Sequence, residues 1–493
     1  MTLFEKLRHL GKDTALYGLG DALQKLINFL LFPVYARFLS KADFGLQDLI
    51  LTTVIVISSI LVLGLDSAAA RHYYDAELPD EKRNILSTWL WFELLLSIPV
   101  TLLLVLLAKP ICSLIFDDPS LSPYFCLGIA SLPFALVAGV SMLTLRLTFQ
   151  AKAFSILSAS GVLIHGLAAI YFVVILGKGV MGVFVAYIFA SVARAILGML
   201  LTYKHFRYSL SKSWLKPMLY FGVPLVPASL FIWVFNYSNR YFVLHFSTLE
   251  EVGIFSVGSR VSSILLLITL AFQTAWGPFA FSLIKDEALA KRTYSTALSY
   301  FLLLSLSFTV CLSVFARETV LLLATQAYER AAPLVSFLCY GFIAWGAYYI
   351  VGTGAAIAKK SYHVTIATLL AATITCLMNY LFIPRFGIIA AAFSTMFGNF
   401  AALLYGFYTG QHHFTVPYDY KKLFLLLTSA TCAITVGALI DYSSVFWLPS
   451  LLPYKLLLIC GFVASLFLFR VITTTELRLV LTYLPSFLPR NAS

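Results

Sequence analysis

Charged side chains are scarce in this chain of 493 residues. Asp, Glu, Lys and Arg make up only 11% of it, whereas hydrophobic residues make up 60%. A soluble domain carries about a quarter charged residues, so this composition excludes an ordinary soluble fold. No loop approaches the size of a soluble domain, and an enzyme would therefore have to work within a membrane or with short loops. We expect a protein that is not an enzyme.

Cysteine clusters of the metal-binding kind are also missing. The seven cysteines are widely spaced, and no two stand at the spacing of metal ligands. Most lie in or beside apolar segments, where they are expected to be packing residues. The sequence therefore predicts no metal site and no bound cofactor, although coupling to a proton or sodium ion stays open.

Long apolar runs are what the chain has in abundance. Runs of about 20 residues, the length that crosses a bilayer, occur near 14–36, 43–65, 86–108, 123–145, 154–176, 180–203, 217–243, 252–274, 293–315, 331–357, 362–383, 387–409, 421–440 and 448–469. We predict an all-α polytopic membrane protein with about fourteen transmembrane helices.

The chain repeats itself at an offset of 208 residues. Residues Phe38, Ser40, Asp43, Phe44 and Gly45 recur as Phe246, Thr248, Glu251, Val252 and Gly253, and three further groups match at the same offset. In both copies a hydroxyl residue followed three positions later by an acid is typical of a helix start. Each copy holds six spans, an even number, so the copies are expected to be parallel repeats.

The repeat predicts the domain organisation. We expect an N-terminal six-helix lobe at 1–210, a C-terminal six-helix lobe at 211–412, and two additional transmembrane helices with a tail at 413–493. Two lobes that repeat inside a membrane point to a transporter.

Loop charges predict the orientation. The N-terminal segment and every second loop after it hold 22 of the 34 basic residues, and the opposite loops hold only eight. The positive-inside rule then places both termini in the cytoplasm. The net charge of +12 follows from this asymmetry, with some attraction to anionic lipid head groups, and requires no nucleic-acid partner.

The start of the second copy carries a family resemblance. The run 221–230 reads FGVPLVPASL, residues 236–241 read NYSNRY, and residues 250–257 read EEVGIFSV. The first copy agrees with its run 32–40, FPVYARFLS, and with 69–75, AARHYYD. These segments closely resemble the oligosaccharide (O-antigen type) flippases, the polysaccharide biosynthesis transporters of the multidrug/oligosaccharidyl-lipid/polysaccharide exporter superfamily. One departure is Asn239, where many relatives carry an acid before the arginine.

The resemblance implies a function. Its members move oligosaccharide linked to undecaprenyl pyrophosphate from the cytoplasmic to the outer face of the bacterial inner membrane, in polysaccharide biosynthesis such as that of lipopolysaccharide. The partners that it implies are this lipid-linked glycan, membrane lipids, a polysaccharide polymerase and other assembly proteins. Two lobes that alternate access would carry the polar head group, which cannot cross hydrocarbon unaided. Two alternatives stay open: a cation-coupled multidrug exporter of the same superfamily, and a membrane-embedded glycosyltransferase.

Ionisable residues within spans are the candidate site residues, because they are costly in hydrocarbon and usually face a cavity. Asp21 and Lys25 share one face of the first span, where Lys25 would meet substrate phosphate and Asp21 would hold it or bind a coupling ion. A self-neutralising pair is the alternative. Arg260, about eight residues into the eighth span, is predicted to bind phosphate through its guanidinium fork.

Further candidates lie elsewhere. Arg194 in the sixth span and Arg71 in the first cytoplasmic loop are candidate phosphate contacts, although helix bracing and interfacial anchoring explain them too. Glu93 is a candidate site for a proton or sodium ion. Pro224 and Pro227 are expected to kink the seventh span and act as a hinge.

Three charged residues near span ends are expected to be interfacial. Asp48, Asp66 and Arg240 lie where hydration or snorkelling accounts for a charge without a functional role.

Overall fold

The computed structural model describes residues 27, 29–360, 362–443 and 448–469, and every regular element in these ranges is helical. The described chain divides into two compact units, Met1–Ser256 and Val257–Ser493. Thirteen helices are long and apolar enough to cross a membrane. Each overlaps one of the predicted spans from the second to the fourteenth, so the prediction of an all-α polytopic membrane protein is confirmed. Most of the first predicted span lies outside the described residues, and its end is the apolar helix Phe29–Phe38.

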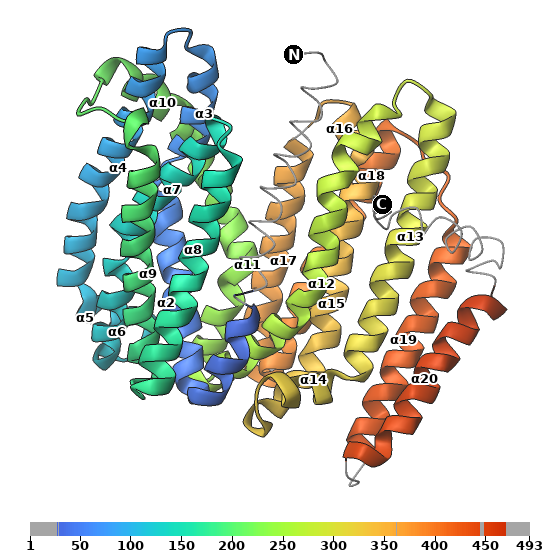
Figure 1. The fold of residues 1–493 in the computed structure, drawn as a ribbon. Coiled ribbons are helices and arrows are strands. Elements are labelled where there is room, and N and C mark those ends of the chain that lie inside the picture. The colour runs from blue at the N-terminus through green and yellow to red at the C-terminus, as the bar shows by residue number, and fades with distance from the viewer. Residues whose placement is uncertain (1–26, 28, 361, 444–447, 470–493) are drawn as a thin grey trace, which may run out of the picture. The chain divides into compact units, whose positions relative to one another are not determined.

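The first unit is built from long helices that stand side by side, with short helices at their ends (Figure 1). Its helices are α2 (Lys41–Leu61), α3 (Leu65–Asp75), α4 (Pro79–Leu106), α5 (Ala108–Phe116), α6 (Ser122–Ala130), α7 (Leu132–Leu147), α8 (Ala151–Ala169), α9 (Gly179–Thr202), α10 (Lys212–Gly222), α11 (Val226–Phe246) and the beginning of α12 (Leu249–Ser282). Helices α3 and α10 pack together at the end of the unit where α4 begins, and α5 and α6 lie at the opposite end.

The second unit contains the rest of α12 together with the remaining helices. They are α13 (Glu287–Val314), α14 (Ala316–Leu323), α15 (Ala332–Val351), α16 (Thr353–Ile357), α17 (Tyr362–Phe386), α18 (Ile388–His413), α19 (Tyr420–Ser443) and α20 (Leu448–Leu468). Helix α18 packs tightly against both α15 and α17. A Cβ at Gly410 would lie only 1.9 Å from the Val351 carbonyl oxygen, so a glycine is what permits the close approach of α15 and α18.

The two helix starts predicted from the repeat are confirmed. Ser40 caps α2 by accepting the Asp43 amide at 3.1 Å, and its hydroxyl donates to the Asp43 carboxylate at 2.8 Å. In the second copy the Glu251 amide donates to the Thr248 hydroxyl at 3.3 Å at the start of α12. Each cap satisfies an amide that the first turn leaves without a partner.

Helices α2 and α12 cross at glycines that are 208 residues apart. A Cβ at Gly45 would lie 2.1 Å from the Leu249 carbonyl oxygen, and one at Gly253 would lie 2.0 Å from the Lys41 carbonyl oxygen. Both distances are far below the 3.3–3.6 Å of an ordinary carbon–oxygen contact. The equivalent glycines of the two copies therefore allow the backbones to touch.

The lobes predicted at 1–210 and 211–412 stay a prediction.

Candidate functional site

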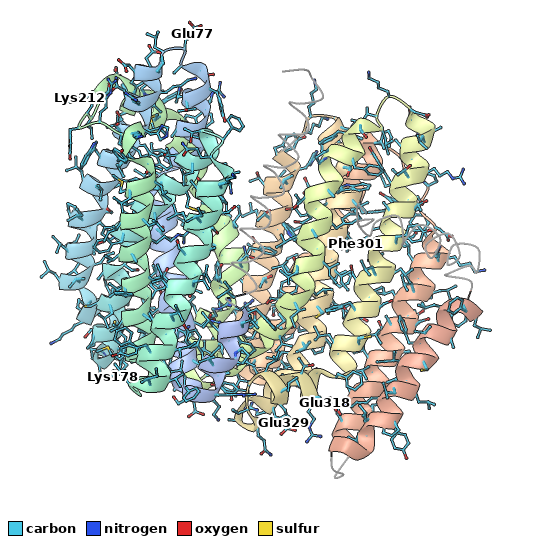
Figure 2. The ribbon with its side chains drawn as sticks, viewed as in Figure 1. Glu77, Lys178, Lys212, Phe301, Glu318 and Glu329 are labelled. Atoms are coloured by element: carbon cyan, nitrogen blue, oxygen red, sulfur yellow. The ribbon has the colours of Figure 1, made fainter. Side chains whose placement is uncertain are left out.

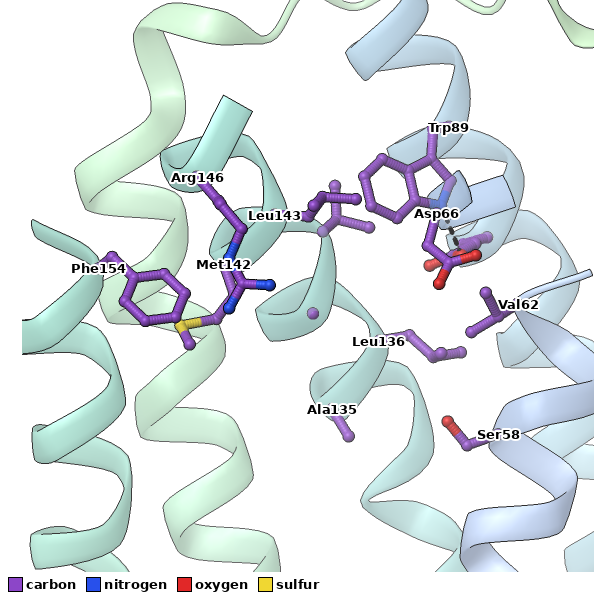
Figure 3. A pocket seen from close by; sticks show the side chains of 13 residues that line it. Ser58, Val62, Asp66, Trp89, Ala135, Leu136, Met142, Leu143, Arg146 and Phe154 are labelled. Atoms are coloured by element: carbon purple, nitrogen blue, oxygen red, sulfur yellow. Dashed lines mark hydrogen bonds between the residues drawn. The ribbon is translucent and has the colours of Figure 1, made fainter. Parts of the chain in front are cut away.

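The first unit contains an open-sided cavity of about 340 Å³ between α2, α3, α4, α7 and the start of α8. Three ionisable side chains line it, Asp66, Glu93 and Arg146, among mostly apolar neighbours. Figure 3 shows Asp66 and Trp89 on one side of the cavity, and Arg146 with Phe154 on the other. The lining therefore offers two carboxylates and one guanidinium in a space that is otherwise mostly apolar.

Glu93 is the most deeply placed acid of this cavity. It is only 2% exposed, and one of its oxygens accepts a hydrogen bond of 2.6 Å from Trp89 Nε1, one turn earlier on α4. A carboxylate accepts up to four hydrogen bonds, so this contact leaves capacity for a proton or a small cation. The position 208 residues later is Phe301, which is 2% exposed and packs on Phe272 with ring centroids 4.9 Å apart. Since the second copy places an apolar ring there, the helix scaffold does not require an acid.

Arg146 completes the charges that line the cavity. Its guanidinium lies over the Phe154 ring at 4.9 Å, where α7 ends and α8 begins. A cation on an aromatic face is held without neutralising its charge. The two carboxylates on the other side of the cavity have the chemistry of a proton or small-cation site (Figure 3).

A second polar cluster joins α2, α11 and the start of α12 within the first unit. Arg240 Nε donates to Asp48 Oδ2, and the Ser256 hydroxyl donates to the same oxygen at 2.7 Å. Asp48 and Arg240 are each 8% exposed. The prediction that these two residues are interfacial and hydrated is therefore wrong: they form a buried ion pair, because α11 packs its charged face onto α2.

Neighbouring polar contacts reinforce the same helix pair. The Tyr241 hydroxyl lies 2.7 Å from the Thr53 hydroxyl, and Trp233 Nε1 donates to the Thr52 carbonyl at 2.9 Å. The repeat contains a sequence signal that could have predicted this cluster. Asp48 and Ser256 are 208 residues apart, and each lies three positions after one of the paired glycines. Asp48 thus provides a carboxylate partner for Arg240, although the residue before the arginine is Asn239.

Arg194 lies within α9, eight residues before its end at Thr202. Its side chain packs against α8, where a Cβ at Gly161 would lie 2.7 Å from Arg194 Cδ. Its Nε is buried without a hydrogen-bond partner, and no carboxylate pairs with it among the described residues. The glycine in α8 makes room for a guanidinium whose charge is not matched by an acid in the described part of the chain.

Arg71 lies beside the predicted hinge. Its guanidinium is over the Phe221 ring at 5.2 Å, and its Nε is 4.0 Å from the Asp75 carboxylate. Two residues after Phe221 the α-helix gives way to a 3₁₀ turn at Val223–Leu225, which separates α10 from α11. Pro224 and Pro227 occupy this break and the first turn after it. The interruption of the seventh span is thus observed, and motion about it stays a prediction.

Three further candidates lie outside the sites described so far. Arg260 lies on α12 within the second unit, half-buried, and its predicted role in phosphate binding stays a prediction. Asp21 and Lys25 lie outside the described residues.

The second unit contains a charged cluster that the sequence patterns did not predict. Lys455 on α20 is fully buried, and its Nζ donates to the two Glu318 oxygens at 2.6 and 2.8 Å and lies 2.7 Å from an Asp441 oxygen. Arg317 Nε donates to Glu329 at 2.5 Å nearby. Figure 2 shows Glu318 and Glu329 at one end of this unit. The cluster fastens α19 and α20 to α14 and satisfies the buried ammonium.

Several solved structures share this fold. A lipid II flippase MurJ in an inward closed conformation superposes with a TM-score of 0.72 at 14% identity, over 92% of this chain and 99% of that one. An inward-facing multidrug resistance MATE family transporter of the MOP superfamily gives 0.67 at 16% identity, over 80% and 94%. A MOP superfamily transporter from Pyrococcus furiosus gives 0.60 at 16% identity, over 83% and 95%. No curated protein matches the chain.

A family model also matches. The model described as polysaccharide biosynthesis protein covers residues 34–333, more than half of the chain. The match includes both copies of the helix-start motif, the buried pair of Asp48 and Arg240, and the cavity that holds Glu93. The chain therefore belongs to the polysaccharide biosynthesis protein family.

Proposed function

We propose that this protein is a flippase that moves a glycan carried on undecaprenyl pyrophosphate from the cytoplasmic to the outer face of the bacterial inner membrane. The membership of the polysaccharide biosynthesis family and the shared fold with a lipid II flippase support a lipid-linked substrate. A pyrophosphate and several sugars cannot cross hydrocarbon bare, so a polar path through the protein is required.

The observation that carries the proposal is the environment of Arg194. A guanidinium inside a membrane span is costly unless an anion meets it. Arg194 has no acidic partner among the described residues, and its Nε is buried without a hydrogen bond. A phosphate oxygen pair fits the guanidinium fork and would supply the missing charge. Arg260, Arg71 and Lys25 are proposed as further phosphate contacts along the path.

The cavity in the first unit supports a role in energy coupling. Glu93 and Asp66 are proposed to bind a proton or sodium ion. The turn at Pro224 and Pro227 is the proposed hinge between lobes at 1–210 and 211–412. Both termini are proposed to be cytoplasmic, and a polysaccharide polymerase is a proposed partner.

Sidedness of the lipid-linked glycan tests the function. Cells depleted of the protein are compared with cells in which it is restored, and the glycan on each face is measured with an impermeant probe. Cytoplasmic accumulation that restoration relieves is the expected result. Unchanged sidedness in depleted cells would refute the proposal.

Arg194 is tested in the same assay. We expect Arg194→Ala to abolish outward delivery and Arg194→Lys to retain part of it, because an ammonium keeps the charge but loses the fork. Lys152→Ala, which removes an exposed cation at the start of α8, is the matched control and should transport normally. Normal delivery by Arg194→Ala at normal expression would remove Arg194 from the substrate path.

The two carboxylates of the cavity favour a second candidate, a cation-coupled multidrug exporter. It predicts drug efflux driven by a proton or sodium gradient in vesicles and normal glycan sidedness in depleted cells. The two candidates therefore give opposite results in the sidedness assay.

A further inference from the structure

A second hollow lies on the outer surface of the first unit, between α4, α7 and α9. Its volume is about 510 Å³, and every residue that lines it is apolar or aromatic. Leu90, Val137 and Ala195 form its floor and are at most 9% exposed. Its rim is open, since Ile196 is 56% and Leu200 is 65% exposed. A buried apolar floor with an exposed apolar rim, on a helix bundle of membrane-spanning length, faces hydrocarbon rather than water.

One end of this groove meets a polar segment. Trp91 lines the groove, and its Nε1 donates to the Arg207 carbonyl at 2.7 Å, while its ring stacks on Tyr208 at 5.4 Å between centroids. Residues 203–216, which include this contact, carry three lysines and one arginine and no acid. Arg207 pairs with Asp80, so the lysines provide the unmatched charge of the segment.

Lys204 continues the helical spacing of two residues that line the groove. On the α9 face, Ile196 and Leu200 are one turn apart, and Lys204 follows one turn later in the 3₁₀ turn that ends the helix. The Lys204 ammonium lies 5.8 Å from the centre of the Tyr203 ring. The groove thus ends in two tyrosines, a tryptophan and a lysine, the residue types that gather at a membrane interface.

The length of the groove indicates which kind of lipid chain it fits. From Leu90 to Ile98, α4 runs eight residues, which is about 12 Å. Half of a hydrocarbon core is about 15 Å thick. The groove therefore matches an acyl chain within one leaflet, and is much shorter than a polyprenyl carrier chain.

We propose that this groove is a binding site for an anionic glycerophospholipid. One acyl chain fills the space between α4, α7 and α9, and the phosphate of the head group lies at Lys204, on the side of the membrane that the loop charges predict to be cytoplasmic. Basic groups beside membrane helices on that side are suited to anionic head groups. The site is separate from the path proposed for the glycan.

The lipid would act on the cavity through two shared helices. On α4, Leu90 and Leu94 face the groove while Trp89 and Glu93 line the cavity. On α7, Val137 lines the groove and Val140 lines the cavity. A chain in the groove holds α4 against α7, and so stabilises the cavity wall that carries Glu93.

The test uses the full-length protein in nanodiscs of equal parts phosphatidylglycerol and phosphatidylcholine. After gentle extraction, native mass spectrometry measures how much of each lipid stays bound. Ile196→Trp and Leu200→Trp fill the groove, and Lys204→Ala removes the charge. Leu167→Trp is the control, because Leu167 is 69% exposed on α8 and does not line the groove.

We expect the wild-type protein and the control to retain phosphatidylglycerol preferentially. Lys204→Ala should lower that preference about fivefold, the factor that one lysine near an anionic head group contributes. The tryptophan variants should lose the retained lipid. Equal retention of both lipids by the wild-type protein, or unchanged retention by both tryptophan variants, overturns the proposal.

A photoreactive phosphatidylglycerol gives a second readout that does not need a variant. A diazirine in its acyl chain should label residues 90–98 and 195–200 above other membrane-facing segments. Labelling spread evenly over all lipid-facing helices would also overturn the proposal. Both readouts are independent of glycan transport, so their failure leaves the proposed flippase activity untouched.

Discussion

The buried pair of Asp48 and Arg240 should hold α2 and α11 together strongly enough to measure. Loss of Asp48 leaves the Arg240 guanidinium buried without its carboxylate, although its Nη1 still donates to the Asn236 carbonyl at 3.3 Å. Removing one partner of a buried pair costs about 3–5 kcal/mol. Ser256→Ala removes one hydrogen bond to a charged group and should cost about 1.5–3 kcal/mol.

A double-mutant cycle separates the pair from its surroundings. Asp48→Asn and Arg240→Met should each lower the free energy of unfolding by about 3 kcal/mol, whereas the double variant should cost no more than about 3 kcal/mol because no charge is left unpaired. The coupling energy is then about 3 kcal/mol. Reversible unfolding in bicelles provides the measurement.

The exposed pair of Glu287 and Lys291 on α13 is the control for the cycle. Its side chains are 65% and 30% exposed and stand four residues apart, so its coupling should be at most about 0.5 kcal/mol. A coupling for Asp48 and Arg240 as small as that of the control would refute the reasoning, since it would mean that water screens the pair.

Four further outcomes are expected. Glu93→Gln should slow glycan delivery and remove its dependence on the ion gradient, measured in proteoliposomes; a gradient response equal to that of the wild type would exclude Glu93 from coupling. Lys455→Ala should destabilise the protein by about 3 kcal/mol in bicelles, because it leaves two carboxylates unpaired, and a neutral effect would contradict the buried cluster. Arg260→Ala should abolish transport while Arg260→Lys keeps part of it, and normal flux in the alanine variant would remove this residue from the path. Gly253→Ala should lower the Tm, because its Cβ would lie 2.0 Å from a carbonyl oxygen, whereas Gly277→Ala on the same helix meets nothing within 4 Å and should leave the Tm unchanged.

The local features of the fold were predictable because neighbouring residues decide them. Thirteen of the fourteen predicted spans are found as helices of sufficient length, and the caps at Ser40 and Thr248 are present. A span depends on about 20 consecutive apolar residues, and a cap depends on a hydroxyl beside the first turn. Neither requires knowledge of what lies across the bundle.

The ion pairs were not predictable in the same way. Asp48 and Arg240 are 192 residues apart, and Lys455 and Glu318 are 137 apart. Each residue alone is a charge near a span end, which hydration explains equally well. The repeat carried a partial signal for the first cluster, since Gly45 and Gly253, and then Asp48 and Ser256, are equivalent positions of the two copies.

The sequence by itself determined the membrane class, the spans, the repeat and the family, because hydrophobic length and short motifs are properties of consecutive residues. Only the tertiary structure decided which charges are neutralised and which are left open. Packing of α11 on α2 pairs Arg240 with Asp48, while packing of α9 on α8 leaves Arg194 without an acid among the described residues. In hydrocarbon the free energy of a charge depends on the groups a few ångströms away, and those are chosen by how the helices pack.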